Sequence, residues 1–518
     1  MRDLSLFAAL FLIAGRATAD VKIEAENAKY SNCKVVYDSR YSGGRALELT
    51  ENNASISFTY TSESNEKHNI FVGYDGLYGN KMVNLSVNGN VASFSVKGLG
   101  ETEVGSYIMK KGSNSIVITP NWTWFRIDYI IIKSDVDNIE FNISKEPVDK
   151  QATESCKTLY TFLYDNFGKR TISGMMTGDM TNVNKTNVTQ HPDVKAVKQI
   201  SGKTPALIGF DFMNTTGLKE NDSWYKEYSQ TVMTLAKDTY KRGGIPAFTW
   251  HWRDPSRQTE AFYTSDCTMK ISDAMNSDGS WDTSSQLYQY IIKDIDAIAN
   301  CLLQLQCEGM ACIFRPLHEA SGGWFWWGRE GAEQFIKLYR LIFDEMVNVK
   351  GVHNVIWVWN AGDNDSEWNP GENYFDVVSA DIYNADYDYS SNYVSFDKLK
   401  GLTGGKKIIA LSENGPIPDI DKQAEEDAMW SWWMPWYQTW NGKFVDKTSA
   451  EEWTKCMNDS RIITMEDHYN GWEIAQSIRN ITDNYYLDHK TYNTQGQLLS
   501  IIPSNTIFIK GGKKYFMK

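Results

Sequence analysis

Two kinds of hydrophobic pattern divide the chain. From residue 20 to 134, apolar and polar residues alternate in short runs such as Ile56–Tyr60, separated by Gly and Asn. Alternation with a period of two predicts half-buried strands, and many short strands with turns between them predict a β-sandwich. After about residue 156, apolar runs of strand length alternate with stretches of helical periodicity such as Ser223–Lys241 and Ser284–Leu305. This second pattern predicts alternating strands and helices.

The apolar runs of the second region predict a closed barrel. They end near Met176, Phe212, Trp252, Glu319, Ala361, Tyr383, Glu413 and Trp436. Eight parallel strands with intervening helices form a (β/α)8 barrel, the TIM-barrel fold, whose strand ends meet at one mouth. An open doubly wound sheet is the alternative, but no Gly-x-Gly-x-x-Gly follows the first strand to support a nucleotide site.

The N-terminus has the pattern of a secretory signal. Arg2 precedes an apolar stretch from Leu4 to Ala14, and small residues up to Ala19 predict cleavage before Asp20. The predicted organisation is a signal peptide (1–19), a β-sandwich, jelly-roll module (20–134), a short linker (135–155), a barrel (156–470) and a C-terminal extension of unassigned role (471–518). We therefore expect a secreted, extracellular protein.

Composition narrows the class of partner. The net charge is −13, which argues against nucleic acid or an anionic membrane as partner. Aromatic residues make up 13% of the chain, with 19 Trp and 28 Tyr, which suits contact with a neutral polysaccharide. No later apolar run approaches the roughly 20 residues of a membrane span. We expect a monomer with a polysaccharide substrate.

Cysteines and glycosylation sequons fit an exported protein. Seven cysteines permit up to three disulfides in an oxidising compartment, with connectivity left open. Two of Cys301, Cys307 and Cys312 are close enough in sequence to pair, and Cys156 with Cys456 would tie the ends of the barrel. Eleven Asn-x-Ser/Thr sequons suggest a glycoprotein of eukaryotic origin.

One stretch of the second region combines a buried strand, a carboxylate and an aromatic loop. Residues 312–328 run from an apolar Cys-Ile-Phe to His318 and Glu319, then to a Gly-Gly turn and three tryptophans beginning at Trp324. A carboxylic acid in a partly desolvated pocket keeps its proton near neutral pH. Aromatic faces pack against the C–H surfaces of sugars, so this layout predicts a sugar site.

A second apolar run ends in another carboxylate, Glu413. Retaining glycosidases need two carboxyl groups about 5–5.5 Å apart, one protonating the leaving oxygen and the other attacking the anomeric carbon. We predict Glu319 as the acid/base and Glu413 as the nucleophile. We expect no cofactor in catalysis, because no His, Asp and Glu cluster with metal-ligand spacing is evident in this region.

The motifs around these residues resemble those of a known family. Arg-Pro-Leu-His-Glu319-(x)4-Trp-Phe-Trp-Trp-Gly, with Leu-Ser-Glu413-Asn-Gly downstream and Trp-His251-Trp upstream, resembles glycoside hydrolase family 26 over about residues 150–470. That family is dominated by endo-β-1,4-mannanases. The resemblance implies a retaining endo-β-1,4-mannanase that cleaves mannan, glucomannan or galactomannan.

The same resemblance implies roles for other residues at the barrel mouth. His251 lines the subsite on the non-reducing side of the cleaved bond, and His318 braces the acid/base. Trp324 stacks on the other side of that bond. Tyr383 donates a hydrogen bond to the nucleophile.

A tryptophan near the eighth strand is expected to form the sugar floor. Trp436 is the preferred residue and Trp433 the alternative. Two other substrates remain open within the family, because β-1,3-1,4-glucanases and β-1,3-xylanases use the same mechanism. A non-catalytic polysaccharide-binding protein is the alternative from another class. It would require the loss of one catalytic Glu or of the support from Tyr383.

The N-terminal module resembles a family 35 carbohydrate-binding module. The resemblance rests on its opening Val-Lys-Ile-Glu24-Ala-Glu26, a Ser-Gly-Gly turn, and the closing Trp122-Thr-Trp124-Phe-Arg-Ile-Asp128. In that family the first and last strands lie together and hold a structural calcium, which here would use Glu24 or Glu26 with Asp128. Their hard oxygen atoms are ligands that Ca²⁺ prefers. Trp122 and Trp124 are the expected sugar platform.

Overall fold

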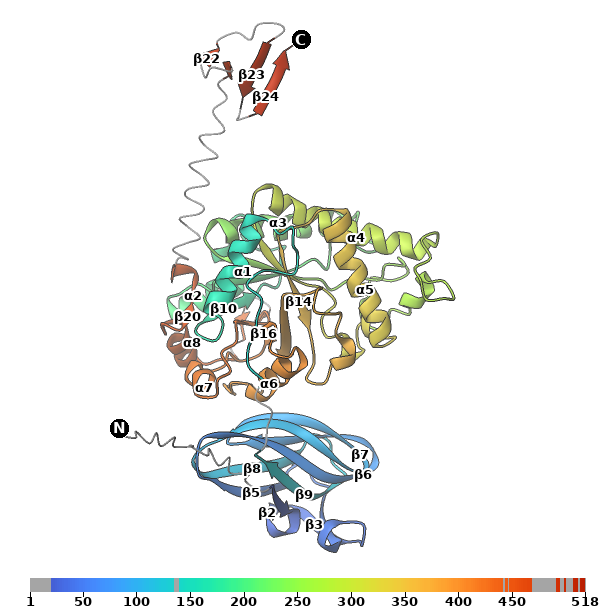
Figure 1. Cartoon of the computed structure of the whole chain (residues 1–518), viewed down its shortest axis with the longest axis vertical. Coiled ribbons are helices and arrows are strands. Elements are labelled where there is room, and N and C mark those ends of the chain that lie inside the picture. The colour runs from blue at the N-terminus through green and yellow to red at the C-terminus, as the bar shows by residue number, and fades with distance from the viewer. Residues whose placement is uncertain are drawn as a thin grey trace, which may run out of the picture.

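The computed structural model describes residues 20–134, 139–440, 443–445 and 447–467, together with four short strands after residue 490. The predicted signal peptide and most of the predicted C-terminal extension lie outside the described residues. None of the described helices is both long and apolar enough to cross a membrane. Figure 1 shows the N-terminal module packed against one side of the second domain.

The N-terminal module is the expected β-sandwich. Its strands are β1 (Val21–Glu24), β2 (Lys29–Ser31), β3 (Cys33–Tyr37), β4 (Arg45–Leu49), β5 (Ser55–Ser62), β6 (Glu66–Val87), β7 (Asn90–Met109), β8 (Gly112–Pro120) and β9 (Phe125–Lys133). They pair in the order β2-β5-β8-β6-β9-β4-β3, with β1 added to β9 and β7 to β6. The first and last strands thus lie together, antiparallel, as the resemblance implied.

Two of the module's strands are longer than the sequence pattern predicts. The apolar runs at Ile70–Tyr74 and Asn84–Gly89 predict two separate strands, but β6 is continuous over 22 residues. Its first part pairs with β9 and its second part with β8, so the strand passes from one layer to the other. The pairing of β6 with β7 is irregular between Gly76 and Lys81, where a Cβ on Gly76 would lie 2.7 Å from the Val96 carbonyl oxygen.

The second domain is a closed parallel barrel. Its strands are β10 (Thr171–Met176), β11 (Leu207–Asp211), β12 (Ile245–Thr249), β13 (Cys312–Arg315), β14 (Val355–Asn360), β15 (Val377–Ile382), β16 (Ile408–Asn414) and β17 (Trp432–Pro435). Each pairs with the next, and β10 pairs with both β17 and β11, which closes the ring. Most strand residues are buried, as expected of parallel strands covered by helices.

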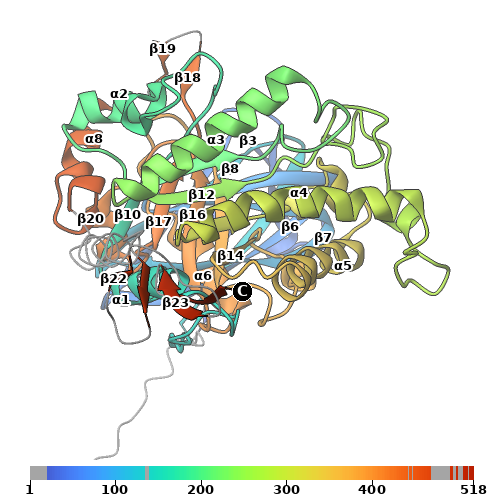
Figure 2. The ribbon, with the colours of Figure 1, turned by 90° about the horizontal axis from the view of Figure 1, so that it is seen from above.

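Helices cover the outside of the barrel, as the view from above shows (Figure 2). They are α1 (Glu154–Asn166), α2 (Pro192–Ser201), α3 (Ser223–Lys241), α4 (Gln286–Cys307), α5 (Ala332–Asp344), α6 (Tyr393–Leu402), α7 (Ile420–Glu425) and α8 (Ala450–Met457). Ser285 caps α4 by accepting a hydrogen bond from the Tyr288 amide, and a left-handed Gly202 ends α2. Short strands β18 (Thr439–Trp440), β19 (Lys443–Phe444) and β20 (Ile462–Ile463) complete this domain.

The C-terminal stretch contains four described strands in a small antiparallel sheet. They are β21 (Thr491–Asn493), β22 (Leu498–Leu499), β23 (Thr506–Lys510) and β24 (Lys513–Met517), in the order β22-β21-β23-β24. The sequence pattern does not predict this sheet within residues 471–518. The role of the extension stays unassigned.

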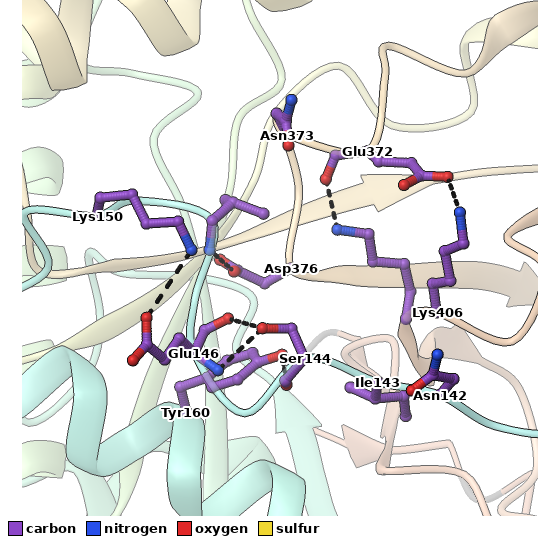
Figure 3. Close-up of a pocket in the computed structure, with 12 residues that line it drawn as sticks. Asn142, Ile143, Ser144, Glu146, Lys150, Tyr160, Glu372, Asn373, Asp376 and Lys406 are labelled. Atoms are coloured by element: carbon purple, nitrogen blue, oxygen red, sulfur yellow. Dashed lines mark hydrogen bonds and ion pairs between the residues drawn. The ribbon is translucent and has the colours of Figure 1, made fainter.

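The linker lies along the barrel rather than free in solvent. The Asn142 amide donates to the Gly405 carbonyl, and the Val148 amide donates to the buried Asp376 carboxylate at 2.7 Å. Figure 3 shows Asn142 and Asp376 among the residues that line a cavity beside the starts of β15 and β16, whose volume is about 310 Å³. These hydrogen bonds between the linker and the barrel hold the linker in place.

None of the seven cysteines is in a disulfide. The pairing of Cys156 with Cys456, one of those that the sequence leaves open, does not form, because their thiols lie against different backbone carbonyls, those of Val355 and Pro418. The local pairing considered near Cys301 does not form either. Cys312 is buried on β13, whereas Cys307 is exposed at the end of α4.

Candidate active site

Glu319 stands at the barrel mouth on a strained backbone. β13 ends at Arg315, four residues before the predicted strand end, and both Leu317 and Glu319 have φ of 53°. Such left-handed conformations cost non-glycine residues about 1–3 kcal/mol each and are frequent at functional sites. The Asn360 side chain accepts a hydrogen bond from the Glu319 amide at 2.7 Å, which holds this turn in place.

The loop after Glu319 presents one tryptophan to solvent and buries two. Trp326 and Trp327 are fully buried, whereas Trp324 is 46% exposed. The Trp324 ring N–H donates to Glu319 Oε2 at 2.9 Å. Gly328 allows the close packing of this loop, because a Cβ there would lie 1.8 Å from the Ala320 carbonyl oxygen. Only Trp324 of the three can therefore face a ligand.

Glu413 lies on β16 and is 4% exposed. Tyr383, directly after β15, donates its hydroxyl to Glu413 Oε2 at 2.6 Å, the contact that the resemblance implied. Arg315 donates to Glu413 Oε1 and, through its other nitrogen, to Asp381 at 2.8 Å. Both oxygens of Glu413 are thus occupied by donors that favour an ionised carboxylate.

Three carboxyl groups converge here. One oxygen each of Glu319, Asp381 and Glu413 lies within 4.8 Å of the others. The sequence predicts the approach of Glu319 and Glu413 but not that of Asp381, because the three residues come from different strands and their spacing in sequence does not reveal the cluster. Among the described residues, Arg315 is the cation that contacts this cluster.

Because one cation cannot balance three negative charges, the cluster favours a state in which one of its carboxyl groups stays protonated. Burial, with the charge of Asp381, raises the pKa of Glu319 to about 7. Burial and Asp381 also raise the pKa of Glu413, while Arg315 and Tyr383 act to lower it. The hydrogen bonds from Arg315 and Tyr383 are stronger to a charged Glu413, so we place the shared proton on Glu319.

Two histidines form a buried chain beneath the mouth. His251 Nδ1 lies 2.6 Å from Asp211 Oδ2, and His251 Nε2 lies 3.2 Å from His318 Nε2. His318 Nδ1 faces the Thr249 hydroxyl at 3.3 Å. Burial lowers the pKa of His318, so it is neutral. The support expected from His318 is not a direct hydrogen bond to the Glu319 carboxyl, because its ring nitrogens face His251 and Thr249.

Other aromatic residues border the same site. Trp436 is partly buried, with its ring centroid 5.7 Å from that of His251, whereas Trp433 is fully buried in the core. Trp436 is thus the one of the two that can face a ligand. Tyr263 is half exposed and stacks on Phe325 with a centroid distance of 5.2 Å. Burial raises the pKa of Tyr263, as does the nearby negative charge of both glutamates.

The module brings its predicted metal ligands together. Glu24 Oε2, Glu26 Oε2 and Asp128 Oδ1 are buried and accept no hydrogen bond. Burial raises the pKa of Asp128 to about 6, and the charges of Glu24 and Glu26 add to this effect. Ser42 donates its amide to Asp128 and its hydroxyl to Glu24, which holds the carboxylates in place. Unpartnered buried carboxylate oxygens fit a hard cation.

The predicted sugar platform of the module is open to solvent. Trp122 is 54% exposed and Trp124 is 51% exposed, at the turn between β8 and β9. Trp124 also has a φ of 72°, which is rare for a residue with a large side chain. Neither ring belongs to the module core, and each presents about half of its surface to solvent.

Comparison with known proteins identifies the barrel. The sequence profile described as glycosyl hydrolase family 26 matches residues 148–467, which is more than half of the chain. The chain belongs to glycosyl hydrolase family 26. It is therefore a glycoside hydrolase, and family 26 enzymes need no cofactor for catalysis. The profile of carbohydrate binding module family 35 matches residues 21–135, which agrees with the observed sandwich.

Relatives match this family 26 chain over most of its length or over about two thirds of it. A mannan endo-1,4-beta-mannosidase of Thermothelomyces thermophilus is 30% identical over 88% of this chain and 92% of its own length. A solved Podospora anserina GH26-CBM35 beta-(1,4)-mannanase matches 88% of this chain and 99% of its own with a TM-score of 0.58 at 26% identity. A beta-mannanase from a symbiotic protist of the termite Reticulitermes speratus, solved with a gluco-manno-oligosaccharide, is 36% identical over 64% of this chain and 99% of its own, with a TM-score of 0.57.

Several residues of this family 26 site were not predicted as functional. They are Asp211, Tyr263, Arg315, Asn360 and Asp381. All but Tyr263 lie at or just beside the carboxyl end of a barrel strand, which is the signal that could have found them. Tyr263 lies in the long segment after β12 and carries no such signal.

Proposed function

We propose that this family 26 enzyme is a secreted endo-β-1,4-mannanase that cleaves internal bonds with retention of anomeric configuration. The observation that carries the proposal is the close approach of Glu319 and Glu413 with unlike partners. Oxygens within 4.8 Å fit the carboxyl separation of roughly 5–5.5 Å typical of retaining enzymes, and leave no room for the water of an inverting mechanism. The mannanase names of relatives that span both domains support the substrate.

In the proposed mechanism, Glu413 attacks the anomeric carbon while Glu319 gives its proton to the departing glycosidic oxygen. The carbon–oxygen bond breaks as the bond to Glu413 forms, which yields a glycosyl-enzyme and a free sugar hydroxyl. Glu319, now ionised, takes a proton from water, whose oxygen displaces Glu413. Tyr383 and Arg315 hold Glu413 ionised before attack. The same hydrogen bonds stabilise its carboxylate when it leaves the sugar in the second step.

The first test is reducing-sugar release from linear β-1,4-mannan, with β-1,3-1,4-glucan and β-1,3-xylan alongside. Release of short oligomers from mannan alone supports the proposal. Release from another polymer changes the assigned substrate but not the catalytic roles of the two glutamates. A Glu319→Gln variant should bind mannan and lose about 10²–10⁴-fold in rate, the contribution typical of a general acid. Retained hydrolysis in that variant contradicts its assignment.

The proposed export rests on the N-terminal pattern of the sequence. Arg2, the apolar stretch to Ala14 and the small residues before Asp20 are the three features of a secretory signal peptide. N-terminal sequencing of protein recovered from the medium of a eukaryotic host should read from Asp20. Protein retained in cells with Met1 intact contradicts export.

We also propose a structural calcium in the module, held by Glu24, Glu26 and Asp128. A cation there would bind the one buried oxygen of each carboxylate that accepts no hydrogen bond, Glu24 Oε2, Glu26 Oε2 and Asp128 Oδ1. Because the folded-state pKa of Asp128 is raised to about 6, its ionisation destabilises the calcium-free fold as pH rises from about 4 to 6. Calcium should therefore raise the melting temperature more at pH 7 than at pH 5. Equal shifts at both values, or none, contradict the site.

A further inference from the structure

The hairpin turn between β6 and β7 contacts the barrel. Asn88 and Gly89 both have positive φ, 52° and 98°, as in the tight turns that favour Asn-Gly. The Gly89 carbonyl accepts a hydrogen bond from the Ser390 hydroxyl at 3.3 Å. The next residue, Asn90, donates its side-chain amide to Glu426 Oε1 at 2.6 Å. The turn therefore reaches two separate loops of the catalytic domain.

Glu426 depends on the module for one of its hydrogen bonds. It is 8% exposed, and its second oxygen accepts from the Ser391 hydroxyl. Within the described residues, no Lys or Arg lies within 4.0 Å of it. Loss of the Asn90 amide would leave a buried carboxylate oxygen without a donor, which is costly because buried charge needs a partner.

Ser391 belongs to the loop that carries Tyr383. This loop runs from the end of β15 to the start of α6, residues 383–392. The Ser391 carbonyl accepts from the buried Trp430 indole at 2.7 Å, and Asn384 donates to Asn392 at 3.0 Å, which joins the two ends of the loop. Ser390, which contacts the module, and Ser391, which contacts Glu426, thus lie in the same loop as Tyr383, eight residues or fewer from it.

The module and the linker also hold the helix that follows the loop. Lys67 pairs with Asp397 of α6 at 2.7 Å in a half-buried contact. Gly105 of β7 lies against Val394, where a Cβ would approach to 2.7 Å. At the other end of α6 the Gly405 carbonyl accepts the linker amide of Asn142, in the segment shown in Figure 3. Contacts at both ends and the middle of α6 oppose rotation of the module about the linker.

We propose that the Asn88–Asn90 turn of the carbohydrate-binding module is a structural part of the catalytic site. It fixes the loop 383–392 and thereby the position of Tyr383 against Glu413. Asn90 is a positioning residue that acts through Glu426 and Ser391. The module then assists hydrolysis of soluble oligosaccharides that do not need its sugar face, in addition to any role in binding polysaccharide. Only the effect on turnover rests on the proposed function.

The test compares Asn90→Asp with Lys110→Ala in the full chain. Asn90→Asp removes the donor and places a second carboxylate against Glu426. Lys110 pairs with Glu425 across the same interface, but both side chains are exposed and neither contacts the loop. Asn90→Ala serves as a milder variant, and melting temperatures show that each protein is folded.

Two measurements decide the outcome. Hydrogen exchange of the amides in residues 383–392 should be faster in Asn90→Asp than in Lys110→Ala and the parent. The kcat on β-1,4-mannotetraose should fall about 3- to 30-fold with KM nearly unchanged, less than the roughly 10²-fold that a 1 Å misplacement can cost. Unchanged exchange, or faster exchange with unchanged kcat, overturns the proposal. A parent inactive on mannan would instead refute the proposed function, and exchange would still test the contact.

Discussion

The hydroxyl of Tyr383 offers the sharpest test of how the site divides its two carboxyl roles. In Tyr383→Phe the ring is kept and the 2.6 Å hydrogen bond to Glu413 Oε2 is lost. A hydrogen bond to a charged group contributes about 1.5–3 kcal/mol, and one pKa unit corresponds to about 1.4 kcal/mol. Because the lost bond favoured the ionised form, the pKa of Glu413 should rise by roughly one to two units.

This shift has a defined signature in the pH dependence. The acid limb of kcat/KM reports ionisation of the nucleophile in the free enzyme, so it should move to higher pH by about one to two units in Tyr383→Phe. The alkaline limb, which reports loss of the proton from Glu319, should move much less. At a pH below the new limb, kcat/KM should fall roughly 10- to 100-fold.

Tyr263→Phe is the matched control. Tyr263 lies near the same two glutamates, yet its hydroxyl has no hydrogen bond to either of them. Its removal should leave both limbs in place. The profile is measured on a soluble mannan oligosaccharide from pH 4 to 9. An acid limb that stays fixed or moves to lower pH in Tyr383→Phe would refute the assignment of Glu413 as the ionised group.

Two further predictions concern neighbours of the same carboxyl groups. Trp324→Phe keeps an aromatic face but removes the N–H that favours ionised Glu319, so the alkaline limb should move to higher pH; an unmoved limb in a pH profile contradicts this. Arg315→Met leaves Asp381 and Glu413 buried without their cation, which should destabilise the fold by about 3–5 kcal/mol at pH 8. The loss of stability should be smaller at pH 4, where the carboxyl groups are protonated. Denaturant unfolding at both pH values measures it, and a loss that is the same at pH 4 and pH 8 contradicts the prediction.

The sequence predicts the barrel well because its signals are local. All eight strand runs were placed, and Ser223–Lys241 matches α3 residue for residue. The largest error at a strand end is at β13, where pairing stops at Arg315 rather than Glu319. Pro316 cannot donate to the ladder and the residues after it turn left-handed, which patterns of hydrophobicity do not register.

The acidic cluster could not be predicted in the same way. Arg315, Asp381 and Glu413 lie on three different strands, and each is unremarkable within its own stretch of sequence. Their meeting depends on strand order and register around the barrel, which β15 and β16 set by pairing Asp381 directly with Glu413. The Tyr383 contact came from family resemblance, not from spacing. Contacts within one helix or strand can be predicted from the sequence pattern, whereas contacts between elements depend on how the chain folds.

Chemical identity alone does not separate the roles of Glu319 and Glu413. Both are glutamates beside one cation, and burial raises the pKa of each. What differs is the set of donors that the strands deliver. Glu413 receives a guanidinium and a phenol, whereas Glu319 receives one indole N–H on a side open to substrate. A proton therefore rests on the carboxyl with the weaker donors, and that carboxyl is also the one beside the exposed Trp324. The loop that supplies the phenol is the loop that the module holds, so the nucleophile's ionisation is linked to the contact between domains.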